Sequence, residues 1–364
     1  MAQETPLPSF SSSARAGPLS AAVLKTLPKI DLHRHLEGSL RLETLVEIAR
    51  KYDLDVPAEP DVLRPHVQML DDDPTPSNFL SKFAVLRRFY CAPEVIGRLA
   101  YEAVVDAARD NVCYLELRFS PQALASQVDF PLDEVMEWVI AGTRQASEEA
   151  AIDVGLVVSL VRHEPVAIGR QVAEIAFDHF TSHNGASRIV GLDLAGDELN
   201  HPAEDFGDLF QEARRIGMGI TVHAGEWSGP ETVRTAVEKL GAARIGHGVR
   251  AVESEDVLQI VRERGVTLEV CLISNLQSGV VYDLRDHPLS QLLAAGVRAT
   301  LNTDDPAVSD SSLTQEYEAS VRLLGLRNDD LRQMNLNAAE AAFLSEEKRR
   351  DLVRRFRQLW PPDL

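Results

Sequence analysis

The chain contains 364 residues, 45% of them hydrophobic, which is enough to bury a large core. Its 37 Lys and Arg residues are outnumbered by 56 Asp and Glu residues, giving a formal net charge of −19. A field of that sign repels phosphate backbones, so we expect no nucleic-acid partner. No apolar run approaches the roughly 18 residues of a membrane-spanning helix, so we expect no membrane partner either.

The N-terminal segment, residues 1–24, differs in composition from the rest of the chain. Much of it is Ser, Ala and Pro, and it lacks the basic start and continuous apolar region of a secretion signal. We expect a disordered leader over 1–24 and a single domain over 25–364. The three cysteines, Cys91, Cys113 and Cys271, form no CxxC pair, which favours the reducing cytoplasm as the compartment.

Strand-like and helix-like segments alternate along the domain. Eight short segments rich in β-branched or apolar residues predict strands at 29–32, 113–119, 154–160, 189–194, 219–223, 244–245, 266–270 and 297–301. Helical periodicity is found at 41–52, 132–150, 166–180, 203–216, 230–241, 253–264 and throughout 313–359. Parallel strands need such crossovers, so the pattern predicts an α/β fold, a (β/α)₈ TIM barrel with additional C-terminal helices.

One region interrupts this alternation between the first two strands. Residues 57–77 contain several prolines and an acidic run, and we expect a long loop there that serves as a lid or binding segment. In the following helix, Phe79, Leu80 and Phe83 share one face. Such a face is most often part of the core, and the alternative is an apolar lid over a pocket.

The segment KIDLHRHLEGS, residues 29–39, carries the first candidate site. Side chains alternate faces along a strand, so His33 and His35 would point the same way after the apolar residues Ile30 and Leu32. Two imidazoles spaced in this way can bind one metal ion, although an isolated HxH is more often a pair of surface histidines. Further ligands on later strands favour the metal.

Such ligands follow at the carboxyl ends of later strands, where barrel enzymes carry their chemistry. With His33 and His35, the side chains of His223 and Asp304 supply three nitrogens and one oxygen. This is an ordinary ligand set for one Zn²⁺, with a place left for a water molecule whose pKa the metal lowers. All six lysines of the chain lie away from the ends of central strands, which favours one metal over a lysine-bridged pair.

Three further side chains at these strand ends are candidates for catalysis. Glu226 lies three residues after a predicted ligand and suits proton transfer. His247 and Asp305 would lie beside the hydroxide, where they orient it or carry charge. Each also has a structural explanation, since His247 occupies a Gly-His-Gly turn and Asp305 precedes Pro306. The concentration of these residues on several strands of one barrel favours function.

Eight motifs resemble, in the same order, those of the adenosine/adenine deaminase family of metal-dependent amidohydrolases, and most of all adenosine deaminases. They span about residues 26–345 and read LPKIDLHRHLEGS, ELRFSP, LVRHEP, GLDLAGDE, TVHAGE, RIGHG, SNLQSG and LNTDDP. The resemblance implies a cytoplasmic, zinc-dependent hydrolase of purine salvage. Its substrate would be a 6-aminopurine nucleoside, foremost adenosine or 2′-deoxyadenosine, which it would convert to the 6-oxo form with release of ammonia.

The resemblance also implies a role for each matching residue. The zinc ligands would be His33, His35, His223 and Asp304. Glu226 would protonate the purine ring nitrogen next to the reacting carbon, His247 would position the hydroxide, and Asp305 would accept from the hydroxide and contact the purine. The remaining substrate contacts would come from His35, Glu37, the backbone of Gly196, and a hydrophobic lid of Phe79, Leu80 and Phe83.

Two positions depart from the family pattern. Glu37 stands where adenosine deaminases usually carry an aspartate that reaches the ribose, and glutamate there is more typical of adenine deaminases and of deaminases of larger nucleosides. SNLQSG resembles the nucleoside branch rather than the SNxKL of the adenine branch, and Cys271-Leu272 replaces the usual Cys-Pro step. The alternatives to adenosine are therefore adenine and a larger 6-aminopurine nucleoside such as aminodeoxyfutalosine.

Overall fold

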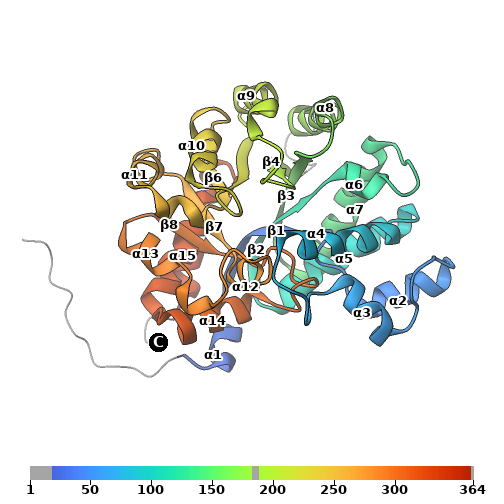
Figure 1. Ribbon diagram of the computed structural model, residues 1–364, viewed down its shortest axis with the longest axis horizontal. Coiled ribbons are helices and arrows are strands. Elements are labelled where there is room, and N and C mark those ends of the chain that lie inside the picture. The colour runs from blue at the N-terminus through green and yellow to red at the C-terminus, as the bar shows by residue number, and fades with distance from the viewer. Residues whose placement is uncertain (1–18, 183–187, 362–364) are drawn as a thin grey trace, which may run out of the picture.

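The structure, a computed structural model, describes residues 19–182 and 188–361. Eight parallel strands form one sheet in sequence order, and helices surround it (Figure 1). The strands are β1 (Lys29–His35), β2 (Val112–Phe119), β3 (Asp153–Val161), β4 (Ile189–Ala195), β5 (Gly219–Ala224), β6 (Arg244–His247), β7 (Thr267–Val270) and β8 (Arg298–Leu301).

The helices between β1 and β5 are α2 (Leu42–Lys51), α3 (Pro60–Val67), α4 (Pro76–Leu86), α5 (Pro93–Arg109), α6 (Pro121–Ala125), α7 (Leu132–Ala150), α8 (Val166–Ser182) and α9 (Gly207–Arg215). The later ones are α10 (Pro230–Glu238), α11 (Glu255–Glu263), α12 (Leu272–Gln277), α13 (Leu289–Ala294), α14 (Leu313–Leu324), α15 (Asn328–Ala341) and α16 (Glu346–Leu359). Short 3₁₀ turns include η3 (Val249–Glu253) and η4 (Leu284–Asp286).

The first and last strands meet through the residues just beyond β8. The N–H of His35 donates to the carbonyl of Asp304 at 2.8 Å, and the N–H of Asp304 donates to the carbonyl of His33 at 2.8 Å. The N–H of Leu32 donates to the side chain of Asn302 at 3.0 Å. These bonds bring the ends of the sheet together, and the predicted (β/α)₈ barrel is confirmed.

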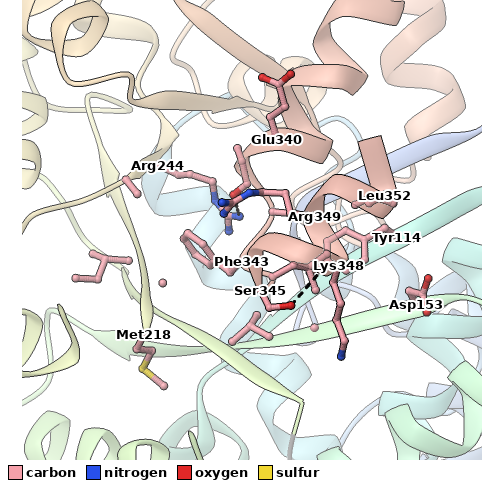
Figure 2. Close-up of a pocket in the computed structure, with 18 of the residues that line it drawn as sticks. Tyr114, Asp153, Met218, Arg244, Glu340, Phe343, Ser345, Lys348, Arg349 and Leu352 are labelled. Carbon is pink, nitrogen blue, oxygen red and sulfur yellow. Dashed lines mark hydrogen bonds between the residues drawn. The ribbon is translucent and has the colours of Figure 1, made fainter. Parts of the chain in front are cut away.

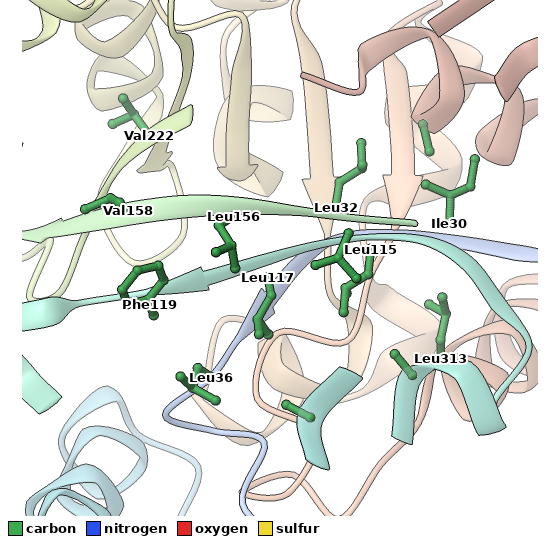
Figure 3. Packing of buried hydrophobic residues seen from close by; sticks show 14 of the residues in the cluster. Ile30, Leu32, Leu36, Leu115, Leu117, Phe119, Leu156, Val158, Val222 and Leu313 are labelled. Carbon is green, nitrogen blue, oxygen red and sulfur yellow. The ribbon is translucent and has the colours of Figure 1, made fainter. Parts of the chain in front are cut away.

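The apolar side chains of the strands face the surrounding helices. On β2, Leu115, Leu117 and Phe119 belong to the same core as Leu313 of α14 (Figure 3). The alternate residues of β2, Glu116 and Arg118, form ion pairs with residues of β6 and β7. Because neighbouring residues of a strand point to opposite faces, the barrel interior contains charged groups, whereas many such barrels fill it with branched aliphatic side chains.

A cavity of about 1550 Å³ opens at the amino-terminal ends of the strands (Figure 2). Phe343, between α15 and α16, lies at this end, and the guanidinium carbon of Arg244 lies 3.5 Å from its ring centroid. The lining includes many arginines, but among the described residues no histidine lines it. The predicted chemistry therefore does not lie at this end of the barrel.

The structure corrects the expectation of a long loop over residues 57–77. The segment contains helix α3, which buries Leu63 and Val67, and it ends in the first residues of α4. Pro60 occupies the first turn of α3, a position where proline needs no N–H partner. Leu63 and Val67 are four residues apart and so lie on one helical face, a signal that the polar and acidic residues around them obscured.

The helical segment predicted over 313–359 consists of three separate helices, α14, α15 and α16. Gly325, with φ of +71°, ends α14, and β8 and β1 both contact α15. The expected leader, 1–24, lies mostly outside the described residues. Its last residues belong to α1 (Ala21–Thr26), in which Leu24 is buried. None of the described helices combines the length and apolarity needed to cross a membrane.

Candidate active site at the carboxyl ends of the strands

A second cavity, of about 440 Å³, opens at the carboxyl ends of the strands. Its lining includes every site residue predicted from the sequence except His33, which lies fully buried beside it: His35, Glu37, Phe79, Leu80, Phe83, Gly196, His223, Glu226, His247, Asp304 and Asp305. The structure thus brings residues of β1, β4, β5, β6 and the β8 end together with the helix α4. This volume lies within the range typical of small-molecule sites.

Three histidines and one aspartate converge at the base of this cavity. Asp304 Oδ1 lies 3.2 Å from His33 Nε2 and 3.3 Å from His35 Nε2, and His35 Nε2 lies 3.2 Å from His223 Nε2. The Nε2 of His247 lies farther away, 3.8 Å from Asp304 Oδ2. Groupings of these ligand atoms that could hold a metal ion include His33, His223, His247 and Asp304, and also His35, Asp304 and Asp305.

Buried carboxylates orient two of the histidines from the barrel interior. His33 Nδ1 lies 2.9 Å from Glu269 Oε2, and His223 Nδ1 lies 3.0 Å from Asp193 Oδ1. Burial alone would raise the pKa of Glu269, but the guanidinium groups of Arg118 and Arg244 hold it well below its usual range. A carboxylate at Nδ1 places a proton there and directs the Nε2 lone pair into the site, as in many metal centres.

The backbone adopts left-handed conformations at two of the converging residues. His247 and Asp304 both have φ of +61°. Non-glycine residues seldom adopt this conformation, and they cluster at functional sites where the surrounding structure enforces it. Ser274 on α12 donates from Oγ to Asp304 Oδ2 at 2.6 Å and fixes the carboxylate.

Two buried acids face this cluster. Burial raises the pKa of Glu226 well above its usual range, and the nearby carboxylates of Asp304 and Glu198 raise it further. Burial also raises the pKa of Asp305, and neighbouring Asp304 adds to that effect. The pKa of Asp304 itself is held well below its usual range, because the surrounding histidines outweigh the effect of burial. The site therefore holds carboxyl groups with raised pKa beside one with lowered pKa, an arrangement suited to acid–base chemistry.

The loop that carries Glu226 is held by a single carboxylate. Glu198 Oε2 accepts from the backbone N–H groups of Glu226, Trp227 and Ser228 at 3.1, 2.8 and 3.1 Å, and Oε1 accepts from that of Gly225 at 2.6 Å. Hydrogen bonds to a charged acceptor are among the stronger ones in proteins. Glu198 is buried, and its hydrogen bonds fix the backbone that carries the side chain of Glu226.

Glu37 also lines this cavity. Its Oε1 accepts from the N–H of Ser120 at 2.7 Å, whereas its buried Oε2 has no hydrogen-bond partner in the described chain. Burial raises the pKa of Glu37 to about 7. Gly38 is required here, because a Cβ at this position would lie 1.9 Å from Asp305 Oδ1. Phe79, Leu80 and Phe83 of α4 form the apolar wall of the same cavity.

Gly196 contributes backbone rather than a side chain. Its φ of +99° suits glycine, and a Cβ there would lie 2.7 Å from His163 Nδ1. The N–H of the next residue, Asp197, donates to His163 Nδ1 at 3.3 Å. The peptide groups around this glycine therefore border the cavity directly.

Several residues that organise the site have no assigned role in the sequence-based prediction. They are Asp193, Glu198, Glu269, Asn275 and His287, which support the converging groups from behind. A usable signal exists for two of them, because Asp193 and Glu269 are lone charges inside otherwise apolar strands. A charge at such a position must face a polar partner inside the barrel.

The comparisons with known proteins agree with this geometry. The model of the adenosine deaminase family matches residues 28–359. The adenosine deaminase of Klebsiella pneumoniae (strain 342) is 41% identical over 331 residues, which cover 91% of this chain and 98% of that protein. The adenosine deaminase of Escherichia coli O1:K1 / APEC is 39% identical over 328 residues, which cover 90% of this chain and 97% of that protein.

Solved structures share this fold. The adenine deaminase of Arthrobacter aurescens has a TM-score of 0.80 at 25% identity, with 91% of this chain and 98% of that chain covered. The Arabidopsis protein ADAL, crystallised with IMP, has a TM-score of 0.82 at 27% identity, with 94% and 99% covered. The family match and the relatives near 40% identity lead to one conclusion: the chain belongs to the adenosine deaminase family.

Proposed function

We propose that the protein is a zinc-dependent hydrolase that deaminates adenosine and 2′-deoxyadenosine, giving the 6-oxo nucleosides and ammonia. The observation that carries this proposal is the convergence of three histidines and Asp304 beside the buried acid Glu226, at the base of a cavity of about 440 Å³. The support from relatives is that proteins named adenosine deaminase share about 40% of their residues with this chain.

The donor set fits one Zn²⁺. A tetrahedral zinc ion with bonds of about 2.0–2.1 Å holds its ligand atoms about 3.3 Å apart. The three separations between His33 and Asp304, His35 and Asp304, and His35 and His223 are 3.2, 3.3 and 3.2 Å. In addition, the buried Nε2 of His33 has no hydrogen-bond partner among the described residues. When bound, the ion would acidify a water molecule toward neutral pH and so supply the nucleophile.

The side chains around this position suit the remaining steps. Glu226, whose pKa burial raises, would carry a proton at neutral pH and donate it to the purine ring nitrogen next to the reacting carbon. The buried Oδ1 of Asp305 has no partner in the described chain. The positive charge of a bound ion would lower the pKa of Asp305, so that its ionised carboxylate would accept a proton from the attacking water. His247, 3.6 Å from Glu226 Oε2, would orient that water from the other side.

Glu37 and the apolar wall support a nucleoside over a free base. Ser120 holds one oxygen of Glu37 in place, so the free oxygen can accept from a sugar hydroxyl. Phe79, Leu80 and Phe83 would cover the ligand from the α4 side. The longer glutamate thus takes the part that aspartate takes elsewhere in the family. The solved structure of an adenine deaminase is 25% identical to this chain, whereas the adenosine deaminase of Klebsiella pneumoniae (strain 342) is 41% identical.

An ammonia-release screen tests the substrate. Adenosine, 2′-deoxyadenosine, adenine and a bulkier 6-aminopurine nucleoside should be compared by kcat/KM, and we expect adenosine to be highest. Elemental analysis should find about one zinc per chain by the ligand count. Chelation should abolish turnover and added Zn²⁺ should restore it. Faster deamination of adenine than of adenosine would place the enzyme in the adenine branch, and two tightly bound ions would contradict the single-metal site.

A substitution sharpens the choice between nucleoside and base. Glu37→Ala should lower kcat/KM for adenosine by about 10–100-fold, because a hydrogen bond to a charged group contributes about 1.5–3 kcal/mol. The value for adenine should change little, since adenine has no sugar hydroxyl. Glu37→Gln can keep its oxygen on the Ser120 N–H and present its amide N–H to the hydroxyl oxygen, so it is the matched control for loss of the whole side chain. Equal losses for the two substrates would show that Glu37 does not recognise the sugar.

A further inference from the structure

A line of buried side chains leads from His247 away from the reaction cavity. His247 Nδ1 lies 3.1 Å from Asn275 Nδ2 on α12, and Asn275 Oδ1 lies 3.2 Å from His287 Nε2. The line ends at the backbone N–H of Leu289, which donates to His287 Nδ1 at 3.1 Å. Asn275 is fully buried and His287 is 3% exposed. Neither occurs among the described residues that line the cavity.

The direction of every hydrogen bond in this line follows from its last member. A backbone N–H can only donate, so His287 Nδ1 must accept and carries no proton. Burial lowers the pKa of His287 to about 3, so its ring is neutral at physiological pH. A neutral imidazole with a bare Nδ1 carries its proton on Nε2 and donates from there. The oxygen of Asn275 must face that donor, which fixes the orientation of its amide.

The same reasoning continues into the site. With its oxygen turned to His287, Asn275 presents its amide nitrogen to His247 Nδ1 and donates to it. His247 Nδ1 therefore accepts, and the proton of the neutral ring lies on Nε2. The opposite edge of the ring agrees, because the carboxylate of Asp304 lies on that side, with its Oδ2 3.8 Å from Nε2.

We propose that His287 and Asn275 are positioning residues that hold His247 in the tautomer with its proton on Nε2, the nitrogen that faces the reaction cavity. This inference rests on the proposed function for its catalytic meaning. In this tautomer His247 can donate a hydrogen bond to the attacking water but has no lone pair for it. It can then serve neither as the base nor as a zinc ligand, which leaves His35 as the third histidine of the metal site and Asp305 as the proton acceptor.

The tautomer can be measured without turnover. In full-length, zinc-loaded protein labelled with ¹⁵N at histidine, two-bond ¹H–¹⁵N correlations distinguish rings protonated at Nδ1 from rings protonated at Nε2. The His247 ring, identified by its absence in His247→Gln, should be protonated at Nε2. A wild-type ring protonated at Nδ1 would overturn the proposal. Because no substrate is involved, this result stands even if the screen shows a substrate other than adenosine.

Substitutions in the line test its effect on turnover. Asn275→Asp presents a carboxylate oxygen to His247 and should move the proton to Nδ1. We expect kcat to fall by about 10–100-fold, as is typical when a supporting group behind a metal site is lost. KM should stay near the wild-type value, because Asn275 does not line the cavity. Unchanged kcat with an unchanged tautomer would show that Asn275 does not set the proton.

His287 offers a rescue experiment. His287→Phe keeps the ring shape and removes the donor to Asn275, so kcat should fall. His287→Gln replaces the donor at the position of Nε2 and should recover most of that loss. His179→Gln, at another buried histidine on α8, is the control for loss of an imidazole and should leave kcat unchanged. Equal losses in His287→Phe and His287→Gln, with His247 still protonated at Nε2 in both, would refute the role of His287.

Discussion

The two ends of the barrel differ in how far the protein itself supplies partners for buried charged and polar groups. At the amino-terminal end, Arg244 lies between two carboxylates, 2.5 Å from Glu116 Oε2 and 2.6 Å from Glu269 Oε1, and it stacks on Phe343. All three charged side chains are fully buried. Each charge there faces an opposite charge of the protein itself, which is the condition under which buried charges are tolerated.

At the carboxyl end, several buried polar atoms make no hydrogen bond within the described part of the protein, although His33 Nε2 lies 3.2 Å from Asp304 Oδ1. Among the described residues, His33 Nε2, Glu37 Oε2 and Asp305 Oδ1 have no hydrogen-bond partner. Leaving a buried polar group without a partner costs about 1–3 kcal/mol, and more for a charged group. These atoms surround one cavity, so the unfavourable energy is explained if a metal ion and a substrate complete their bonds.

This difference predicts that the amino-terminal end contributes mainly to stability, whereas the carboxyl end contributes mainly to activity. Changes at the carboxyl end should remove activity while leaving the free energy of unfolding unchanged or higher. Changes at the amino-terminal end should lower the free energy of unfolding while the folded molecules keep their turnover rate. The substitutions below test both halves of this expectation.

The largest effect is expected for Glu226→Gln. Glutamine keeps the shape of the side chain but cannot donate the proton, so kcat should fall by about 10²–10⁴-fold. The zinc content should stay near the wild-type value, because Glu226 is not a predicted ligand. The melting temperature should be equal or higher, since the change removes a buried acid beside Asp304 and Glu198. Steady-state kinetics, elemental analysis and calorimetry measure the three quantities.

Glu231→Gln, at an exposed acid on α10, is the control for that experiment and should change none of the three quantities. A Glu226→Gln enzyme within tenfold of the wild-type kcat would exclude this residue as the proton donor.

The matching change at the amino-terminal end is Arg244→Met. It leaves Glu116 and Glu269 buried with less compensating charge, and removal of one partner from a buried ion pair typically costs about 3–5 kcal/mol. Denaturant unfolding should show a loss of that size, while kcat per folded molecule stays near the wild-type value because Arg118 still pairs with Glu269 at 2.8 Å. Arg355→Met, on the exposed pair with Asp153, should cost less than about 1 kcal/mol.

The sequence predicted the barrel because apolar strands and amphipathic helices leave local periodic signals, and it indicated most of the candidate site residues because they follow those strands directly. The structure confirms the eight strands and places the predicted side chains around one cavity. The supporting groups were harder to find. Glu198 holds a loop 27 residues further on, and His287 reaches His247 only through Asn275, so neither contact leaves a periodic signal.

Glu198→Gln tests such a supporting group with a smaller expected effect than loss of the acid. The amide nitrogen of glutamine cannot accept, so the N–H groups of the Glu226 loop would lose part of their acceptor. A displacement of the acid by about 1 Å is enough to lower kcat by about 10²-fold. Steady-state kinetics should show this loss with zinc content retained. Wild-type kcat would show that the loop keeps its position without Glu198.

The smallest effect is a pH-dependent contribution of His287 to stability. Burial lowers its pKa to about 3, whereas an unfolded histidine titrates near 6.5. Between these values acid protonates the unfolded chain first, so this contribution is complete above pH 6.5 and is lost as the pH falls toward 3. His287→Gln does not titrate. The unfolding free energy of wild type minus that of His287→Gln should therefore fall by about 2 kcal/mol from pH 7 to pH 5. A His287→Gln difference that is flat with pH would show that His287 is not held neutral.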